Sequence, residues 1–106
     1  MTQKQIQYIK DNNLFGLNDV LTEKESWDDL ELIKSEIVTN IANTVQYYWI
    51  DKDDYSKNRA LLDYIQENEA DIILSGVNDL EKYNVDNYVD SMMLLAKDIL
   101  EVKIMK

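Results

Sequence analysis

A stretch of twenty-three residues without glycine or proline, Asp28 to Ile50, constrains the fold of this chain more than any other feature. At about 1.5 Å per residue, a helix of that length would extend about 35 Å, roughly the diameter of a small domain. The larger apolar residues follow one another by three or four positions, which is the spacing of the inner face of an α-helix. They are Leu30, Ile33, Ile37, Ile41, Val45 and Tyr48, with Val38, Ala42 and Trp49 widening the stripe on one side. We therefore expect a long central helix at about residues 28–50, with neighbours on two faces.

Shorter helical patterns lie on both sides of this stretch. Thr2 is a candidate N-cap for a helix over 3–13, and Gly16 suits the end of this helix in a left-handed conformation. Asn18 could cap one further turn holding Val20 and Leu21. Thr22 with Glu25, or Ser26 with Asp29, has the spacing of a capping box at the start of the long helix.

The second half of the chain predicts a helix from Tyr55 to about Ala70 and a final helix from Asn84 or Asp86 to about Met105. Residues 72–74 form a short apolar run that fits either a strand or a buried helix. Because no partner strand is evident, we expect the helix to continue to about Leu74 and to break at residues 75–76. The sequence thus predicts an all-α fold: a single helical domain over residues 1–106, built as a compact bundle of four to five helices around the long one.

Composition limits the chemistry of the chain. It contains no Cys and no His, so Cys-based zinc sites and histidine catalysis are excluded. There are 21 acidic and 11 basic residues, a net charge of −10. Such a chain is repelled by nucleic acid and by anionic membranes, and is attracted to basic proteins. An acidic surface that serves only solubility is the alternative. With no signal peptide and no apolar run near the 18 or so residues of a membrane span, we expect a protein of the bacterial cytoplasm.

An acidic run, Asp51, Asp53 and Asp54, resembles the start of a calcium-binding loop, but the pattern fails. The position that needs glycine holds Ser56, and the position that needs glutamate holds Leu62. We interpret the run as an exposed turn between two helices, and we expect its three carboxylates to belong to the partner-binding surface. No paired acids lie in a setting typical of a substrate cleft, and the two glycines form no phosphate loop. We therefore expect no enzyme activity, no metal and no cofactor.

Two features indicate a partner-binding surface. The first is a set of acids spaced four residues apart, Asp63, Glu67 and Asp71, with Glu69 between the last two. On one helix they would form a row with steps of about 6 Å. Successive phosphates of a DNA strand are spaced similarly, at roughly 6–7 Å. Like charges at this spacing destabilise a helix. The second feature is Tyr47, Tyr48 and Trp49, which point about 100° apart and cannot all enter one core. Tyr47 is our candidate for a surface residue that anchors a partner. The alternative is that Tyr47 lies at a solvated edge of the helix and that the acids form a solvated face without a binding function.

The leading hypothesis is a small inhibitor that binds a basic nucleic-acid-binding protein and blocks it. Phage inhibitors of host nucleases, including anti-CRISPR and anti-restriction DNA mimics, are also short, acidic and free of Cys, but this chain is similar to them in composition alone. An immunity protein or antitoxin against a basic toxin is the second hypothesis. A helical scaffold that forms a homodimer is the third, because the last helix is apolar on more than one face, at Ile99, Leu100, Val102, Ile104 and Met105.

Overall fold

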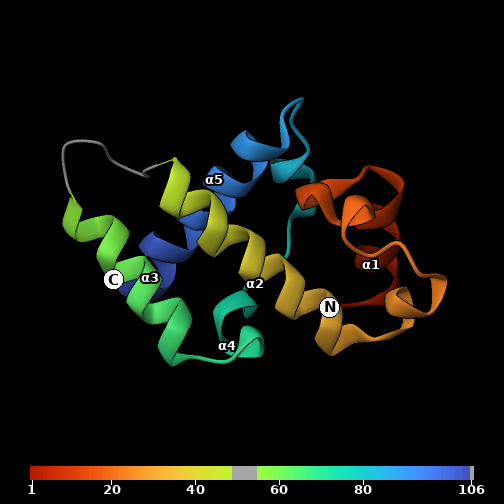
Figure 1. The fold of residues 1–106 in the computed structure, drawn as a ribbon, viewed down its shortest axis with the longest axis horizontal. Helices are drawn as coiled ribbons and strands as arrows, with labels where there is room; N and C mark the ends of the chain where they lie inside the picture. Colours follow the sequence, from red (N-terminus) through yellow and green to blue (C-terminus); the bar gives the residue numbers. More distant parts are fainter. Residues whose placement is uncertain (49–54, 106) are drawn as a thin grey trace.

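The structure, a computed structural model, describes residues 1–48 and 55–105. It is all-α, as predicted: helices pack into a compact bundle around one long helix, and the described residues contain no β-strand (Figure 1). None of the helices formed by these residues combines the length and the apolar character that crossing a membrane requires. With η marking short 3-10 or π-helical segments, the elements are α1 (Gln3–Asp11), η1 (Leu14–Asp19), η2 (Lys24–Asp28), α2 (Leu30–Tyr47), α3 (Tyr55–Glu67), α4 (Ala70–Leu74), η3 (Leu80–Tyr83), α5 (Tyr88–Ile99) and η4 (Leu100–Ile104).

Helix α2 crosses the middle of the molecule, with α1 and η1 towards one end and α3 towards the other (Figure 1). Four residues of the predicted stripe have no exposed surface: Ile33, Ile37, Ile41 and Val45. The helix contacts α5, α4 and α3, and it also contacts η1 and η2. Neighbours on more than one side explain why its apolar stripe is wide. The prediction of a long central helix is confirmed.

Both ends of α2 differ from the predicted bounds. Asp29 is the N-cap and accepts a hydrogen bond from the backbone N–H of Leu32, so the helix begins at Leu30. At the other end Tyr47 is the last helical residue, and Tyr48 is extended with φ −121° and ψ 95°. Tyr48 is 55% exposed, so its placement in the inner stripe is wrong. Residues 49 and 50 lie outside the described residues.

The connection before α2 is held by Trp27. This side chain is buried, and its indole N–H donates to the carbonyl of Leu21 at 2.9 Å. Residues 24–28 form η2 instead of a first turn of α2. Neither predicted capping box, at Thr22 or at Ser26, therefore starts the long helix, because the chain turns once before Asp29 caps it.

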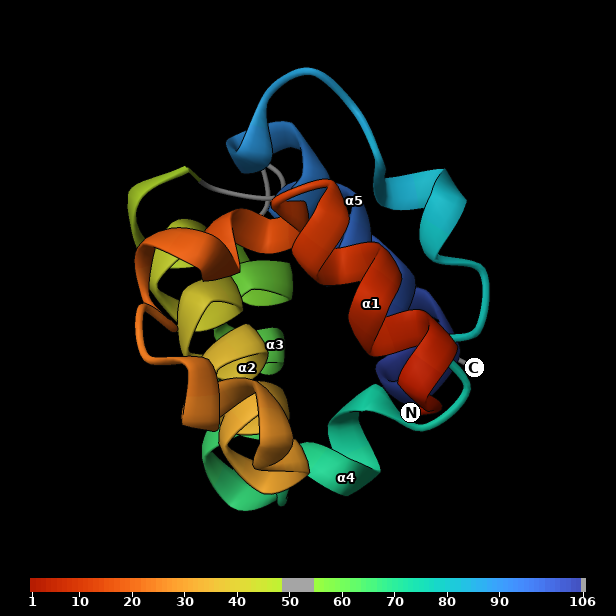
Figure 2. The same cartoon turned by 90° about the vertical axis from the view of Figure 1, so that its right-hand side faces the viewer.

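The N-terminal segment confirms the predicted cap and the left-handed glycine, and it corrects two other predictions. Thr2 caps α1 in a reciprocal capping box with Gln5. Gly16 has a left-handed φ of +67°, but it does not end the helix, because α1 ends at Asp11 and Gly16 lies within η1. Asn18 does not cap a further turn, because it lies within η1 and the chain is not helical at Val20 and Leu21; its side-chain amide donates to the carbonyl of Lys10 at 2.9 Å. Figure 2 views the bundle from the end at which α1 lies.

The predicted continuous helix from Tyr55 to Leu74 is wrong, because it breaks after Glu67. The side-chain amide of Asn68 donates to the carbonyl of Tyr64 at 2.9 Å, a bond that competes with continuation of the helix. Glu69 is extended, and the short helix α4 then turns Ile73 into the core, where it has no exposed surface. The apolar run 72–74 is thus helical and not a strand, with Ile73 and Leu74 buried and Ile72 49% exposed.

The C-terminal helix begins later than predicted and ends differently. Asn87 caps α5, so Asp86 precedes the helix. After Ile99 the chain continues as the π-helical segment η4. Ile99 and Leu100 are buried within the bundle, whereas Val102 and Met105 are exposed. Part of the apolar surface of this helix is therefore buried within the monomer. The homodimer stays a prediction.

Candidate functional site

The predicted row of carboxylates is divided between two helices. Asp63 and Glu67 lie on α3, Glu69 lies at the N-cap of α4, and Asp71 lies in its first turn. Because the helix breaks between Glu67 and Ala70, the regular step of about 6 Å does not continue to Asp71. The structure thus overturns the arrangement as one helical row, while a role of the individual residues in binding stays a prediction.

Two of these acids also form ion pairs with basic side chains. Arg59 Nε lies 3.5 Å from Asp63 Oδ1, and Lys34 Nζ of α2 donates to Asp71 Oδ1. The hydrogen bond from Lys34 to Asp71 raises the pKa of this lysine above its usual value of about 10.5. Asp71 therefore links α4 to α2 through an ion pair. Glu67 and Glu69 are exposed. The other predicted acids, Asp51, Asp53 and Asp54, lie outside the described residues.

Tyr47, the predicted anchor, is 81% exposed and lies on the wall of a hollow of about 320 Å³. The hollow lies between the end of α2, the start of α5 and η1. Two more exposed tyrosines line it, Tyr48 and Tyr88. We call it the tyrosine groove; its lining residues are Gly16, Asp19, Val20, Asn40, Asn43, Thr44, Tyr47, Tyr48, Tyr88 and Val89. Asp19 is the single charged residue among these, so the described residues of the groove combine aromatic faces with one carboxylate and include no cation.

The floor of the tyrosine groove depends on Gly16. A Cβ placed on this glycine would lie 3.6 Å from Tyr88 Cδ2, which is ordinary contact, so the Tyr88 ring lies directly over the turn. The left-handed φ of +67° is what favours glycine at this position. Sequence reasoning missed Tyr88, because its spacing to Met92 and Leu95 places it on the inner stripe of α5. At the first residue of the helix, however, Tyr88 is 61% exposed.

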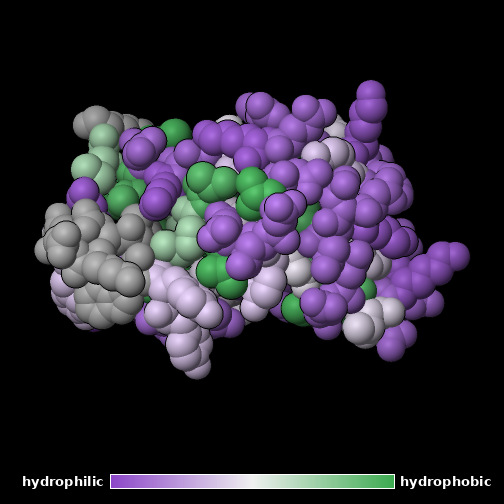
Figure 3. All heavy atoms as spheres, turned by 90° about the horizontal axis from the view of Figure 1, so that it is seen from above, coloured by the Kyte–Doolittle hydropathy of each residue, from purple (hydrophilic) through white to green (hydrophobic). Residues whose placement is uncertain are grey.

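A second group of acids, which the sequence did not single out as a binding surface, lies before α2. Asp19, Glu23, Glu25 and Asp28 are all exposed on the segment between α1 and α2. None of the four makes an ion pair with another described residue. This acidic segment begins at the wall of the tyrosine groove, because Asp19 belongs to both. Figure 3, which views the molecule from above, shows small hydrophobic patches among mainly hydrophilic atoms.

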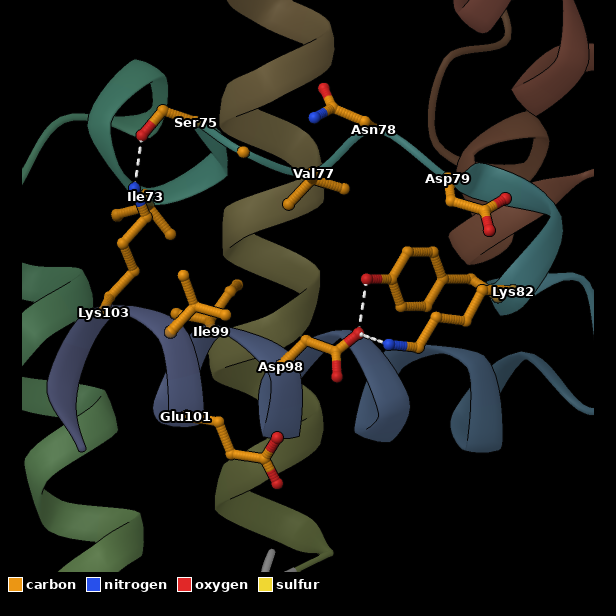
Figure 4. A pocket seen from close by; sticks show the side chains of 13 residues that line it. Ile73, Ser75, Val77, Asn78, Asp79, Lys82, Asp98, Ile99, Glu101 and Lys103 are labelled. Atoms are coloured by element: carbon orange, nitrogen blue, oxygen red, sulfur yellow. Dashed lines mark hydrogen bonds and ion pairs between the residues drawn. The ribbon is translucent and has the colours of Figure 1, made fainter. Parts of the chain in front are cut away.

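A hydrogen-bonded cluster lies elsewhere, beside α5 (Figure 4). Tyr83 Oη donates to Asp98 Oδ2 at 2.6 Å, and Lys82 Nζ lies 2.7 Å from the same oxygen. Burial, with the hydrogen bond to Asp98 as a second cause, raises the pKa of the Tyr83 hydroxyl above its usual value of 10. The hydrogen bond to Asp98 likewise raises the pKa of Lys82. Both groups therefore hold their protons more strongly in the folded protein than in the unfolded chain.

This cluster predicts a loss of stability at alkaline pH. A raised folded-state pKa stabilises the protein below the unfolded pKa of about 10, and that contribution disappears as the pH rises through the folded pKa. We expect the melting temperature of the wild type to fall above this pH more steeply than that of Tyr83→Phe, which has no hydroxyl to ionise. Melting followed by circular dichroism across this pH range measures the difference.

The matched control is Tyr47→Phe, which removes a hydroxyl from an exposed ring and should keep the wild-type pH profile. Equal slopes for Tyr83→Phe and the wild type would contradict the role of the Tyr83 hydroxyl.

Within residues 1–48 and 55–105, no three acidic side chains are placed so that they could hold a metal ion. Comparison of the chain with known protein families, with curated proteins and with solved structures found no match.

Proposed function

We propose that this protein binds a basic surface of a nucleic-acid-binding protein and thereby blocks it. The tyrosine groove is the observation that carries the proposal. It offers the faces of three exposed tyrosines, the carboxylate of Asp19 and the amides of Asn40 and Asn43, without a lysine or arginine among its lining residues.

The chemistry of the groove suits an arginine side chain. Its planar guanidinium stacks on aromatic faces and donates several hydrogen bonds to carboxylate and amide oxygens. Tyrosine is also among the residue types that contribute most of the binding energy at protein interfaces. An arginine of the partner, placed between Tyr47 and Tyr88 and near Asp19, would therefore meet both kinds of contact.

Charge supports the same class of partner. The net charge of −10 attracts basic proteins and raises their association rate. The four exposed acids of the acidic segment extend this negative field from the wall of the groove. Phosphate mimicry by a regular helical row is no part of the proposal, because that row required one continuous helix. Blocking follows from occupancy: a basic surface covered by this protein is closed to nucleic acid.

Capture of bound proteins from a bacterial lysate tests the proposal. We expect the immobilised chain to retain at low salt a basic protein that elutes as salt rises, because salt screens charge pairing. The purified partner should then bind nucleic acid more weakly when this protein is added, as measured by fluorescence anisotropy. A partner that is not basic, or whose nucleic-acid binding does not change, contradicts the proposal.

Matched charge variants locate the surface that the partner uses. Glu23→Gln with Glu25→Gln neutralises the acidic segment, and Glu67→Gln with Glu69→Gln neutralises the exposed part of the predicted row. Both pairs remove two charges from exposed positions. We expect the first pair to lower the salt concentration at which the partner elutes, and the second pair to lower it less.

An immunity protein or antitoxin would use the same surface against a basic toxin. The two activities differ in the partner and not in the groove. A toxin gene beside the gene for this protein would favour immunity, and a phage or plasmid neighbourhood would favour counter-defence against a host nuclease.

A further inference from the structure

The C-terminal half of α2 supplies a strip of side chains to the tyrosine groove. Asn40, Thr44 and Tyr47 follow one another by four and three positions, so they lie on one face of the helix, and all three line the groove. Tyr47 is exposed and Asn40 is half-buried, whereas Thr44 is 9% exposed. Thr44 is thus the single buried residue among the described residues that line the groove.

The hydroxyl of Thr44 has no hydrogen-bond partner among the described residues. It does not even make the bond to a carbonyl three or four residues earlier that a helical threonine often makes. No polar side-chain atom of the described residues is both fully buried and unpaired, so the Thr44 oxygen must keep access to the groove that this residue lines. Unpaired polar groups are rare in protein interiors and cost free energy, so this hydroxyl indicates a bond that a ligand completes.

Asn40 adds an acceptor whose orientation is set by the fold. Its Nδ2 donates to the carbonyl oxygen of Phe15 at 3.1 Å, and Phe15 is buried. Because a carbonyl oxygen only accepts, the amide of Asn40 must turn its nitrogen to Phe15, and its Oδ1 remains as an acceptor. None of the described residues donates to this Oδ1. The groove therefore holds two unused acceptors, Thr44 Oγ1 and Asn40 Oδ1, one helical turn apart.

We infer that the tyrosine groove selects arginine over lysine, and that Thr44 and Asn40 make this selection. A guanidinium group has five N–H donors in one plane, so it can donate to both acceptors while its face lies on a tyrosine ring. This inference rests on the proposed function, because it concerns how the same groove recognises its basic partner. It adds a choice between two cations that the negative charge of the protein attracts equally.

Lysine fits the same arrangement less well. Its ammonium group is compact and strongly hydrated, and it has no planar face with which to stack on Tyr47 or Tyr88. To reach a threonine that is 9% exposed, the ammonium group must give up hydrating water. The two acceptors of the groove replace only part of that hydration.

Two probes of equal charge test the selection without any partner: N-acetyl-argininamide and N-acetyl-lysinamide. Each is titrated into the full-length protein, with amide resonances in ¹H–¹⁵N NMR spectra as the readout. We expect N-acetyl-argininamide to shift the resonances of Thr44 and Tyr88 and to bind about tenfold more tightly than N-acetyl-lysinamide. Equal affinities of the two probes, or no shift at these two residues, overturn the inference.

Thr44→Val tests the hydroxyl, because it keeps the shape of the side chain and removes the oxygen. We expect N-acetyl-argininamide to bind this variant about fivefold more weakly and N-acetyl-lysinamide to bind it unchanged. The melting temperature should not fall, since the hydroxyl makes no bond within the described fold. Thr44→Ser should restore the preference for arginine. Thr39→Val is the matched control on an exposed position of α2 outside the groove, and it should change nothing.

The outcomes for these variants separate recognition from a structural role. Wild-type binding of N-acetyl-argininamide by Thr44→Val overturns the inference, and so does an equal loss of both probes. Asn40→Ala should also weaken N-acetyl-argininamide more than N-acetyl-lysinamide, although it removes the bond to Phe15. Equal weakening of both probes by Asn40→Ala would show that Asn40 acts only through the fold, and would overturn its part in the selection.

The inference and the proposed function fail in different experiments. A chain that captures a basic partner but binds both probes equally keeps the proposed function and loses the selection. A chain that prefers N-acetyl-argininamide but captures no basic partner keeps the selection and loses the proposed function.

Discussion

Phe15→Ala should lower the free energy of unfolding by about 3–5 kcal/mol, the range observed when a buried aromatic side chain is reduced to alanine. Phe15 is 1% exposed, and its ring packs on that of Tyr83 with 5.9 Å between centroids. Asn40 of α2 donates to the Phe15 carbonyl at 3.1 Å, so this residue joins the turn after α1 to the central helix. A loss of that size is a large part of the about 5–15 kcal/mol that stabilises a typical domain.

Denaturation in urea, followed by circular dichroism, measures this change. Phe15→Leu is the matched control, because it keeps an apolar side chain in the same left-handed turn and should cost about 1 kcal/mol. Neither variant removes the backbone strain at φ +60°, since both retain a Cβ. A loss below about 1 kcal/mol for Phe15→Ala would mean that the turn can close around the missing ring.

Tyr47→Ala combined with Tyr88→Ala should weaken binding to the captured basic partner by at least about 100-fold. Each truncation of an interface anchor typically costs about 2 kcal/mol, which corresponds to roughly 30-fold in affinity. Both rings line the tyrosine groove, so the double variant removes two of its three tyrosines. Isothermal titration calorimetry with the purified partner measures the loss.

The fold should survive both substitutions, because Tyr47 is 81% and Tyr88 is 61% exposed. Ile72→Ala is the control: Ile72 is a large apolar residue that is 49% exposed and lies outside the tyrosine groove. The affinity of the Ile72→Ala variant for the partner should equal that of the wild type. A double tyrosine variant that binds as tightly as Ile72→Ala would remove the tyrosine groove from the proposed function.

The sequence predicted the features that depend on local periodicity. The inner stripe of α2 from Ile33 to Val45 is buried as expected, since three- and four-residue spacing makes one face of a helix wherever it occurs. The cap at Thr2 and the left-handed turn at Gly16 were also predictable, because each depends on a few neighbouring residues.

The candidate site was predicted less well, because it depends on contacts between distant residues. Glu67 and Asp71 have the spacing of neighbours on a helix, but the bond from Asn68 to Tyr64 and the burial of Ile73 break the helix between them. Tyr48 and Tyr88 continue apolar stripes in the sequence, yet both are exposed at the ends of their helices. Periodicity gives the direction of a side chain, and it does not give the point at which the core ends.

By itself, the sequence determined the all-α class, the central helix and the strong negative charge, because these follow from the spacing and the number of residue types. Only the tertiary structure decided which acids are paired, as Asp71 is with Lys34, and which aromatic rings gather, as Tyr47 and Tyr88 do in one groove. The physical reason is that pairing and gathering depend on how helices that are distant in the chain pack together. The energies of that packing are not contained in any single stretch.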